Sequence, residues 1–281
     1  MNRRLFVKRL TLAAAGGLSL YNARAHAAVG RRLSRIGMQL YTVRRELEKD
    51  FEGTLRQVAA LGYREVEFAG YFGHAPAEVK NILKRLKLDA PAAHVPFSEL
   101  RSDLRPAIEA AQKIGHKYLL LAWLPPEERR TLEQYRRLAD LCNEAGARTQ
   151  RAGLQFAYHN HDFEFAPLEG QLPYDLLLER TDPRTVKLEM DLYWTVKGGA
   201  NPVEYFERQP GRFHLLHVKD MDSTPRRFFA DVGQGVIDFK SIFAHAARAG
   251  VRHYFVENDE PAGSPFDSLR TSIDYLRRLE F

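Results

Sequence analysis

A single eightfold β/α barrel is the fold class that this sequence predicts, and three observations predict it. Short apolar segments of strand length alternate with amphipathic segments, and their starts lie roughly 30 residues apart. Residues 28–281, which follow a basic leader, match the usual length of one such barrel, about 250 residues. No low-complexity tract or Pro/Gly-rich linker divides the chain. The alternation favours parallel strands joined by helices in one α/β domain.

The predicted strands are short apolar or alternating runs. They are Ile36–Leu40, Glu65–Phe68, Ala90–Val95, Tyr118–Ala122, Leu154–His159, Val186–Asp191, Phe213–Val218 and Tyr254–Glu257. Helical periodicity lies between them, over Leu47–Leu61, Val79–Leu86, Leu104–Ile114 and Leu132–Ala145. Gly62, Gly115 and Gly250 each precede a strand, as a C-terminal helix cap should. A doubly wound open sheet is the alternative, but the sequence lacks the glycine-rich phosphate loop typical of that fold.

The first 27 residues are predicted to be an export signal that is cleaved from the mature protein. Arg3 and Arg4 stand in a segment that resembles a twin-arginine signal, a weakly apolar stretch follows over Leu10–Tyr21, and Ala25–Ala27 offers a cleavage site. The apolar stretch is too short for a membrane anchor. We therefore expect export to the periplasm by the twin-arginine route, no stable membrane insertion afterwards, and a catalytic barrel domain over residues 28–281.

The basic charge of the chain comes from this leader. The whole chain has 42 Lys and Arg against 36 Asp and Glu. Five of the basic residues and none of the acidic ones fall within the first 27 residues, so the mature chain has a net charge of +1. Bulk charge therefore does not predict a nucleic-acid partner. Cys142 is the single cysteine and falls in a helical pattern, which is typical of a small core residue.

Four of the later predicted strands end in pairs of polar residues spaced two apart. The pairs are His159 and His161, Glu189 and Asp191, His217 and Lys219, and Glu257 and Asp259. Positions i and i+2 of a strand point the same way, and the residues beside these pairs are mostly apolar. We therefore expect the polar side chains to face the barrel interior at the carboxyl ends of the strands, where barrel active sites lie.

Polar groups that converge from four strands need a compensating charge. Burying an unpaired carboxylate costs several kcal/mol, roughly, even after relaxation. A divalent cation removes this cost, because carboxylate oxygen and neutral imidazole nitrogen are its natural ligands. The polar residues at the end of any one strand could instead form structural ion pairs or be hydrogen-bonded core histidines. Because such residues end four successive predicted strands, a metal site is favoured.

These segments resemble the sugar phosphate isomerase/epimerase family, which has the xylose-isomerase-like barrel shared with inosose dehydratases and endonuclease IV. The segments that carry the resemblance are Tyr158–Phe165, Glu189–Trp194, His217–Asp220 and Val256–Asp259, with Gly37–Arg44 and Gly233–Phe239 in support. The resemblance spans nearly the whole mature chain. It is specific for the superfamily rather than for one substrate.

The resemblance implies a divalent metal held by a Glu, an Asp, a His and a second Glu from four successive strands. Asp191, His217 and Glu257 match the last three positions, whereas His159 stands where family members usually carry Glu. Glu164, five residues further on, is the alternative first ligand. We prefer His159 because it ends its strand. Mn²⁺ suits a mixed oxygen and imidazole set with open positions, and Zn²⁺, Co²⁺ and Mg²⁺ are alternatives.

The chemistry predicted for such a site starts with proton loss beside a sugar carbonyl that the metal polarises, which gives an enediolate. In the epimerases that the chain resembles, two metal-bound Glu residues serve opposite faces of the enediolate, which implies catalytic roles for Glu257 and for His159. Return of the proton gives isomerisation or epimerisation of a sugar or keto-sugar, the expected reaction. Loss of a β-substituent from a keto-sugar or cyclitol, as in a lyase or dehydratase, is the alternative, and the His-Asn-His segment adds weight to it.

Further side chains are expected to bind the substrate. Lys219 is predicted to contact an oxyanion or hydroxyl, and Trp194 either stacks on a sugar ring or packs in the core. The other substrate-binding candidates are His161, Glu164, His94 and Glu67, with weaker support for Gln39. The connection Met221–Asp238 is predicted to be a lid or specificity loop. Its arginines, Arg226 and Arg227, are expected in solvent rather than on a phosphate.

Two other functions are alternatives to an enzyme that acts on a sugar. A non-catalytic sugar binder on the same barrel is one of them. The other is an endonuclease, for which the resemblance to endonuclease IV implies three zinc ions and more His and Glu ligands than this sequence offers. The nearly neutral mature chain also argues against DNA. The expected partner is a small-molecule sugar, without nucleic acid, and a homo-oligomer is compatible with the sequence.

Overall fold

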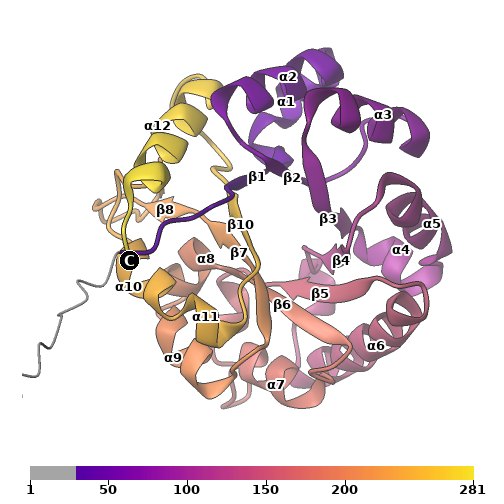
Figure 1. Cartoon of the computed structure of the whole chain (residues 1–281). Helices are drawn as coiled ribbons and strands as arrows, with labels where there is room; N and C mark the ends of the chain where they lie inside the picture. Colours follow the sequence, from indigo (N-terminus) through magenta and orange to yellow (C-terminus); the bar gives the residue numbers. More distant parts are fainter. Residues whose placement is uncertain (1–29) are drawn as a thin grey trace, which may run out of the picture. The chain divides into compact units, whose positions relative to one another are not determined.

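Eight parallel strands close into a barrel that helices surround (Figure 1). The computed structural model describes residues 30–281. The barrel strands are β1 (Gly37–Gln39), β2 (Glu65–Phe68), β3 (Asp89–Val95), β4 (Tyr118–Leu121), β5 (Gln155–His159), β6 (Val186–Asp191), β7 (Phe213–Val218) and β10 (His253–Val256). Their order around the ring is β1-β10-β7-β6-β5-β4-β3-β2. The predicted barrel is confirmed, whereas the predicted export signal lies outside the described residues and stays a prediction.

Each predicted strand is present, with ends that agree within one residue. The helices are α1 (Arg44–Lys49), α2 (Phe51–Leu61), α3 (Pro76–Leu86), α4 (Phe97–Ser102), α5 (Arg105–Ile114), α6 (Leu132–Arg151), α7 (Pro173–Arg180), α8 (Leu192–Lys197), α9 (Pro202–Arg208), α10 (Phe239–Ala244), α11 (Ala246–Ala249) and α12 (Pro265–Arg278). Short 3₁₀ turns are η1 (Leu40–Val43), η2 (Pro126–Glu128) and η3 (Phe163–Phe165). An antiparallel pair, β8 (Asp220–Met221) and β9 (Phe229–Ala230), lies apart from the barrel sheet.

Local capping explains where the helices begin and end. The helical period predicted over Leu47–Leu61 is divided at Asp50, whose side chain accepts a hydrogen bond from the Gly53 N–H and caps α2. Gly62, Gly115 and Gly250 end α2, α5 and α11 with left-handed φ angles of 103°, 108° and 89°. Glycine adopts this conformation without steric cost, so the predicted caps are confirmed.

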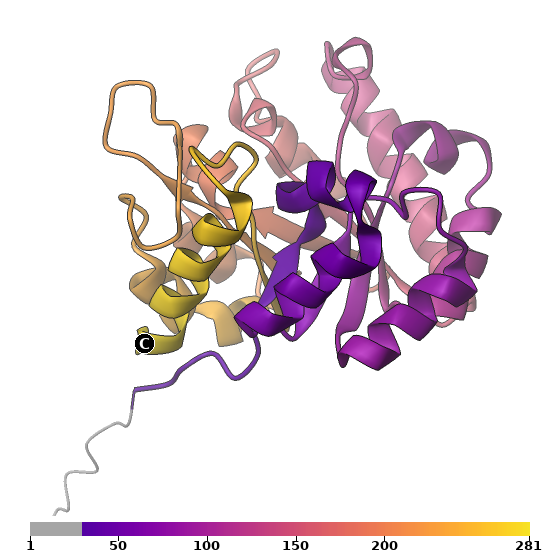
Figure 2. The same ribbon diagram turned by 90° about the horizontal axis from the view of Figure 1, so that it is seen from above.

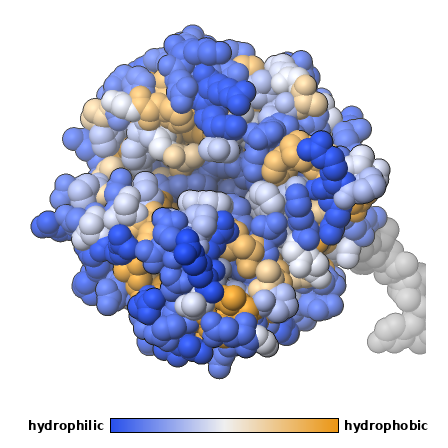
Figure 3. Space-filling view, turned by 180° about the vertical axis from the view of Figure 1, so that it is seen from behind, coloured by the Kyte–Doolittle hydropathy of each residue, from blue (hydrophilic) through white to orange (hydrophobic). Residues whose placement is uncertain are grey.

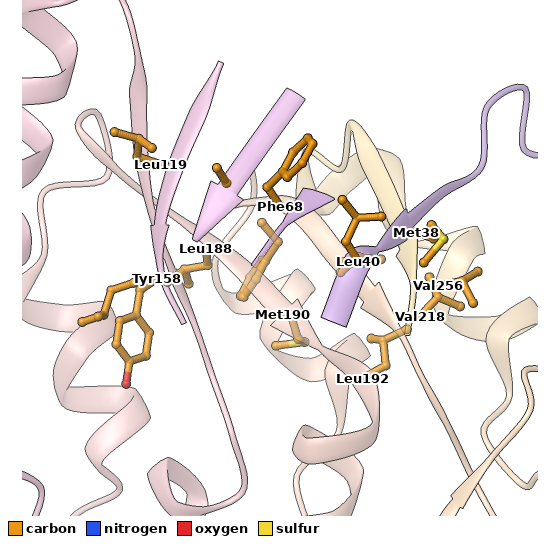
Figure 4. Close-up of a cluster of buried hydrophobic side chains, with 14 of the residues drawn as sticks. Met38, Leu40, Phe68, Leu119, Tyr158, Leu188, Met190, Leu192, Val218 and Val256 are labelled. Atoms are coloured by element: carbon orange, nitrogen blue, oxygen red, sulfur yellow. The ribbon is translucent and has the colours of Figure 1, made fainter. Parts of the chain in front are cut away.

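Alternation along the strands separates two hydrophobic layers. Side chains that point outward pack against the helices, among them Met38, Met190, Val218 and Val256 (Figure 4). A smaller cluster occupies the barrel interior and consists of Ala92, Tyr118, Leu120, Ala157, Leu215 and Phe255. Several of these residues come two positions before a polar residue of the same strand, so the cluster lies on the amino-terminal side of the polar layer. The interior is therefore apolar toward the amino-terminal ends of the strands and polar toward their carboxyl ends, and only the polar layer was predicted.

The carboxyl ends of the strands carry the longer connections. Figure 2 shows these connections rising above the upper end of the barrel, opposite the end where α12 terminates. Figure 3 views this face, where hydrophobic residues are interspersed among hydrophilic ones. Among residues 30–281, no helix is long and apolar enough to cross a membrane.

Burial in the helical layer changes the chemistry of two side chains. Cys142 is buried in α6, and burial raises the pKa of its thiol to about 12, so it is a core residue as predicted. Burial also lowers the pKa of His116 to about 4. The Nε2 atom of His116 lies 3.0 Å from the Tyr71 hydroxyl, and its Nδ1 atom faces the carbonyl of Ala90, which suits a neutral ring.

Acid is expected to destabilise the fold through His116. The unfolded chain binds the proton near pH 6.5 and the folded chain only near pH 4, so stability falls as the pH drops between these values, by about 3 kcal/mol in total. Urea denaturation of the wild type and of His116→Asn at pH 7 and pH 4.5 measures this. The variant should lose less stability in acid than the wild type does. His74→Asn, a change at a more exposed histidine, is the control, and equal acid sensitivity of all three proteins would contradict the prediction.

Candidate active site

The structure brings together the four residues that were predicted as metal ligands. His159, Asp191, His217 and Glu257 stand at the carboxyl ends of β5, β6, β7 and β10 and offer one ligand atom each, all within 4.8 Å of one another. None of the four residues is more than 5% exposed. The strands are consecutive in the ring, although β10 comes last in the chain, and this order makes their ends converge. His159, and not Glu164, lies beside the other three candidate ligands, and its role as a metal ligand stays a prediction.

The donor atoms of this cluster suit a divalent cation. Nε2 of His159, Oδ2 of Asp191 and Nδ1 of His217 are buried and find no hydrogen-bond partner among residues 30–281. His217 Nδ1 nevertheless lies 2.9 Å from Oε2 of Glu257 and 3.7 Å from Oδ2 of Asp191. Each unsatisfied buried polar atom costs about 1–3 kcal/mol. A cation bound by mixed oxygen and imidazole donors would satisfy all of these atoms.

Lys219 provides a positive charge beside the cluster. Its Nζ atom lies 3.2 Å from Asp191 Oδ2, 2.8 Å from Glu257 Oε2 and 2.8 Å from Asp259 Oδ1. Burial would lower the pKa of this lysine, but the carboxylates outweigh burial and raise the pKa well above its usual value. Burial likewise tends to raise the pKa of Glu257, yet Lys219 and His217 hold that pKa well below its ordinary range. Glu257 and Lys219 are therefore both charged.

A second polar layer lies behind the cluster and contains Glu67, His94 and Glu189. Nε2 of His217 lies 2.6 Å from Oε2 of Glu67, a distance at which the ring N–H donates to the carboxylate. Gln39 Nε2 donates to the same oxygen at 2.7 Å. Glu67 is fully buried and does not border the cavity described below, so its predicted contact with substrate is corrected. It orients the imidazole of His217 and leaves Nδ1 directed at the cluster.

The sequence analysis assigned no role to Glu189, although its spacing from Asp191 indicated that it faces inward. Its Oε2 atom lies 3.0 Å from His217 Nε2 and 3.7 Å from His94 Nε2. Glu67, His94, Glu189 and His217 also bring ligand atoms within 4.8 Å of one another. Burial would lower the pKa of His94, but the two glutamates outweigh it and raise that pKa to about 9. A protonated His94 thus compensates part of the negative charge of this layer.

Replacing Glu67 with Gln is expected to weaken metal binding by about 10- to 100-fold, because the amide holds the His217 ring less firmly than a carboxylate does. Equilibrium dialysis against Mn²⁺, followed by elemental analysis, measures this. The matched control is Glu65→Gln on the same strand, since Glu65 pairs with Arg35 and His253 away from the cluster. Equal affinity of the Glu67→Gln variant and the wild type would refute the positioning role.

Glu164 does not lie where the sequence analysis placed it. It is fully buried in η3, where it accepts hydrogen bonds from the Tyr158 hydroxyl and, at 2.8 Å, from the His161 N–H. Burial raises the pKa of this carboxyl to about 7. The turn after β5 carries the side chain to the outward face of the strand with Tyr158. Glu164 therefore supports the loop that holds His161 and is neither in the metal cluster nor at the cavity, which corrects its predicted roles.

A cavity of about 970 Å³ opens over the cluster. It is bordered by His159, His217 and Glu257, and by four predicted substrate contacts, His94, His161, Lys219 and Trp194. Sequence reasoning missed several other lining residues, namely Tyr41, Trp123, Arg129, Asp162, Phe163 and Lys197. Tyr41 and Trp123 each lie two residues beyond the end of a strand, β1 and β4, and an aromatic residue at that place was the available signal.

The connection over Met221–Asp238 does not border this cavity. Arg227 donates hydrogen bonds to the carbonyls of Val196 at 2.7 Å and Lys197 at 3.4 Å, and Arg226 lies over the ring of Phe228. The two arginines therefore fasten this connection to α8 and to itself. Neither arginine borders the cavity. Arg226 is exposed as expected, whereas Arg227, also expected in solvent, is half-buried against α8.

Fold and site together define a barrel protein with a candidate metal centre at the carboxyl ends of its strands. The chain belongs to the xylose isomerase-like TIM barrel family, whose model matches residues 55–279. A sugar phosphate isomerase/epimerase of known structure from Parabacteroides distasonis is 29% identical, has a TM-score of 0.77, and covers 87% of this chain and 98% of its own. A second structure from that organism, also a sugar phosphate isomerase/epimerase, is 28% identical with a TM-score of 0.74, over 92% of this chain and 97% of its own.

Among curated proteins, the chain is similar to an inosose dehydratase from Lacticaseibacillus casei. The two are 22% identical over 268 residues, which cover 82% of this chain and 89% of the relative. The family resemblance inferred from the sequence motifs is confirmed. Isomerases, epimerases and dehydratases are all represented among the similar proteins.

Proposed function

We propose that the protein is a divalent-metal-dependent isomerase or epimerase that acts on a sugar or keto-sugar. The observation that carries this proposal is the cluster of four buried donors, three of them bordering an open cavity. His159, Asp191, His217 and Glu257 would hold the cation, for which Mn²⁺ is the proposed identity. When bound, it would supply Lewis-acid polarisation of a carbonyl oxygen. The similarity to sugar phosphate isomerases/epimerases supports the substrate class.

The chain's own residues would move the proton. Glu257 borders the cavity and is the proposed proton carrier at the carbon beside the carbonyl. His159 also borders the cavity, but with Nε2 on the cation and Nδ1 3.3 Å from the Ala122 carbonyl its ring would keep no free lone pair, so its proposed role is that of a metal ligand alone. Lys219 borders the same cavity and would donate a hydrogen bond to the oxygen on which negative charge develops. Trp194 presents its ring to the cavity and would orient the sugar.

Elimination is the second candidate reaction, and a specific observation favours it. His161 borders the cavity, its ring centre lies 4.9 Å from that of His159, and its Nδ1 atom finds no hydrogen-bond partner among residues 30–281. Burial holds the pKa of His161 well below its usual value, so the neutral imidazole would take a proton from the carbon beside the carbonyl and then give it to the departing β-substituent. The inosose dehydratase relatives are consistent with this outcome. Both reactions share the first step, loss of the proton beside the carbonyl.

One experiment tests the shared step and separates the two outcomes. The Mn²⁺-loaded protein is incubated in D₂O with a panel of keto-sugars, including keto-inositol, and followed by NMR and ultraviolet absorbance. Deuterium at the carbon beside the carbonyl, without an absorbance change, supports the isomerase or epimerase. A conjugated enone absorbing in the ultraviolet supports the dehydratase. Protein treated with a chelator is the control, and sugar binding without either signal would leave a non-catalytic binder and overturn the proposal.

We also propose that the enzyme acts in the periplasm after removal of residues 1–27, on the sequence signals described above. Replacing Arg3 and Arg4 by Lys should keep the protein in the cytoplasm. Cell fractionation and N-terminal sequencing of the wild type measure this. A wild-type protein that keeps its first residues and stays in the cytoplasm would overturn the proposal.

A further inference from the structure

The cleft over the candidate metal centre continues beyond the cavity described above. An adjoining pocket of about 500 Å³ shares Tyr41, His94, Ala122 and Trp123 with that cavity. Its far side is formed by the segments Val95–Ser98 and Pro125–Glu128, with Arg101. Because four residues border both spaces, the two pockets form one elongated cleft, with Tyr41 and Trp123 at the junction.

The size of the cleft exceeds what one sugar ring needs. Cavities of roughly 300 to 1,000 Å³ typically enclose drug-sized ligands, whereas a hexose has only about twelve non-hydrogen atoms. The inner cavity alone has about 970 Å³, and the adjoining pocket adds about 500 Å³. A monosaccharide placed at the metal ligands would leave the adjoining pocket to solvent.

The junction exposes two aromatic rings. Among the described residues, the exposed large hydrophobic side chains are Tyr41 (42% exposed), Trp123 (49%) and Val236 (56%), and two of these three border the cleft. A guanidinium covers one face of each ring, with Arg44 lying 4.0 Å over Tyr41 and Arg129 lying 4.8 Å over Trp123. Part of each ring nevertheless stays exposed beside the cleft.

Contacts with neighbouring residues hold Trp123 in place. Its ring meets those of His161 and Phe163 edge to face, with centroid distances of 5.1 and 5.8 Å. Arg129 also lies 3.5 Å over Phe163, so its guanidinium contacts both the Trp123 and the Phe163 ring. Such an ordered ring loses little entropy when the apolar C–H face of a sugar packs on it.

The charges around the adjoining pocket indicate a neutral ligand. Two basic side chains border this pocket, and both are paired: Arg101 with Glu128 at 2.8 Å, and the protonated His94 with Glu67 at 3.3 Å and Glu189 at 3.7 Å. Glu127 adds a negative charge. A phosphate would meet no free positive charge from these lining residues. Ser98 and the Arg101–Glu128 pair supply donors and acceptors of the kind that bind sugar hydroxyls.

We propose that this adjoining pocket is a second sugar subsite and that the natural ligand is a neutral disaccharide or glycoside. The reacting ring lies over the metal ligands, and the second ring packs on the exposed part of the Trp123 ring. This inference rests on the proposed function in taking the ligand to be a sugar. It adds that the substrate class is larger than a monosaccharide.

Tryptophan fluorescence tests the subsite directly, because Trp123 and Trp194 are the chain's two tryptophans. The Trp194→Phe variant leaves Trp123 as the only indole. Metal-loaded protein is titrated with glucose and with cellobiose, maltose and trehalose. At least one disaccharide should change the Trp123 emission and bind about tenfold more tightly than glucose. Calorimetry on the wild type provides the affinities independently.

Substitutions of Trp123 test whether this residue contributes to disaccharide binding but not to glucose binding. Trp123→Ala should lower the affinity for the preferred disaccharide by about tenfold and should change the affinity for glucose by no more than about twofold. Trp123→Phe should restore most of the affinity for the disaccharide. Val236→Ala is the matched control, because Val236 is the exposed hydrophobic residue away from the cleft. It should leave the affinities for glucose and for the disaccharide unchanged. Equal affinities for glucose and every disaccharide, equal weakening of both by Trp123→Ala, or no sugar binding would overturn the subsite.

The two proposals fail in different ways. Disaccharide binding that depends on Trp123, without deuterium exchange or enone formation, would support the subsite and refute the proposed enzyme. Metal-dependent exchange on a monosaccharide, with no preference for two rings, would support the enzyme and refute the subsite.

Discussion

Asp191→Asn is expected to abolish metal binding at the cluster and to lower turnover by about a thousandfold. The side chain of Asp191 is fully buried, and its two carboxylate oxygens make different contacts. Oδ1 accepts a hydrogen bond from the Trp194 N–H at 2.9 Å and caps α8. Oδ2 is directed at the metal cluster, where it lies 3.2 Å from Lys219 Nζ and 3.5 Å from His159 Nε2.

The substitution therefore separates the structural task from the proposed chemical one. An asparagine oxygen can still cap α8, so the fold should persist, which circular dichroism checks. The amide that replaces Oδ2 has no negative charge and cannot serve as an anionic ligand. Elemental analysis and deuterium exchange measure the two losses.

Asp182→Asn provides the matched control, because Asp182 is a partly exposed residue paired with Arg184 away from the cleft. It should bind metal and turn over like the wild type. A correctly folded Asp191→Asn protein that binds the cation with wild-type affinity would remove the cluster from the mechanism.

Lys219→Met is expected to lower the free energy of unfolding of the metal-free protein by about 3–5 kcal/mol. The ammonium group is the counter-charge for Asp191, Glu257 and Asp259, all within 3.2 Å of Nζ. Methionine fills a similar volume but leaves these carboxylates uncompensated in a buried site. Saturating Mn²⁺ should restore part of the loss, because the cation then neutralises two of the same groups.

Urea denaturation at pH 7, with and without Mn²⁺, measures the effect. Lys187→Met is the control, since Lys187 is a half-buried lysine that donates to the Gly211 carbonyl rather than to a carboxylate. The control should lose about 1 kcal/mol and show no response to Mn²⁺. A Lys219→Met variant that is as stable as this control would show that Lys219 is not the counter-charge of the site.

Much of the candidate centre was predictable because strand periodicity is a local property. The alternation of apolar and polar residues places Asp191 and His217 on the inward face of their strands whatever the rest of the fold does. The position of each residue at the end of its strand then places it at the mouth of a parallel barrel. The same rule indicated that Glu189 faces inward, although its place beneath the cluster was not predicted.

Side chains that leave the strand pattern were not predictable in this way. Glu164 lies in a 3₁₀ turn, where the period of two no longer applies, and the turn directs its carboxyl to Tyr158. Tyr41 and Trp123 lie in connections, and their meeting at one cleft depends on where the ends of β1 and β4 stand across the barrel mouth.

The sequence by itself determined the eight strands, the glycine caps and the inward polar face, because each depends on residues close together in the chain. Only the tertiary structure decided that Glu67 supports His217, since 150 residues separate two side chains that lie 2.6 Å apart. Closure of the ring lets side chains of β2 and β7, which are not neighbours in the sheet, meet inside the barrel, and no local pattern specifies such a contact. The same closure decided that the cleft extends past the metal ligands toward Trp123.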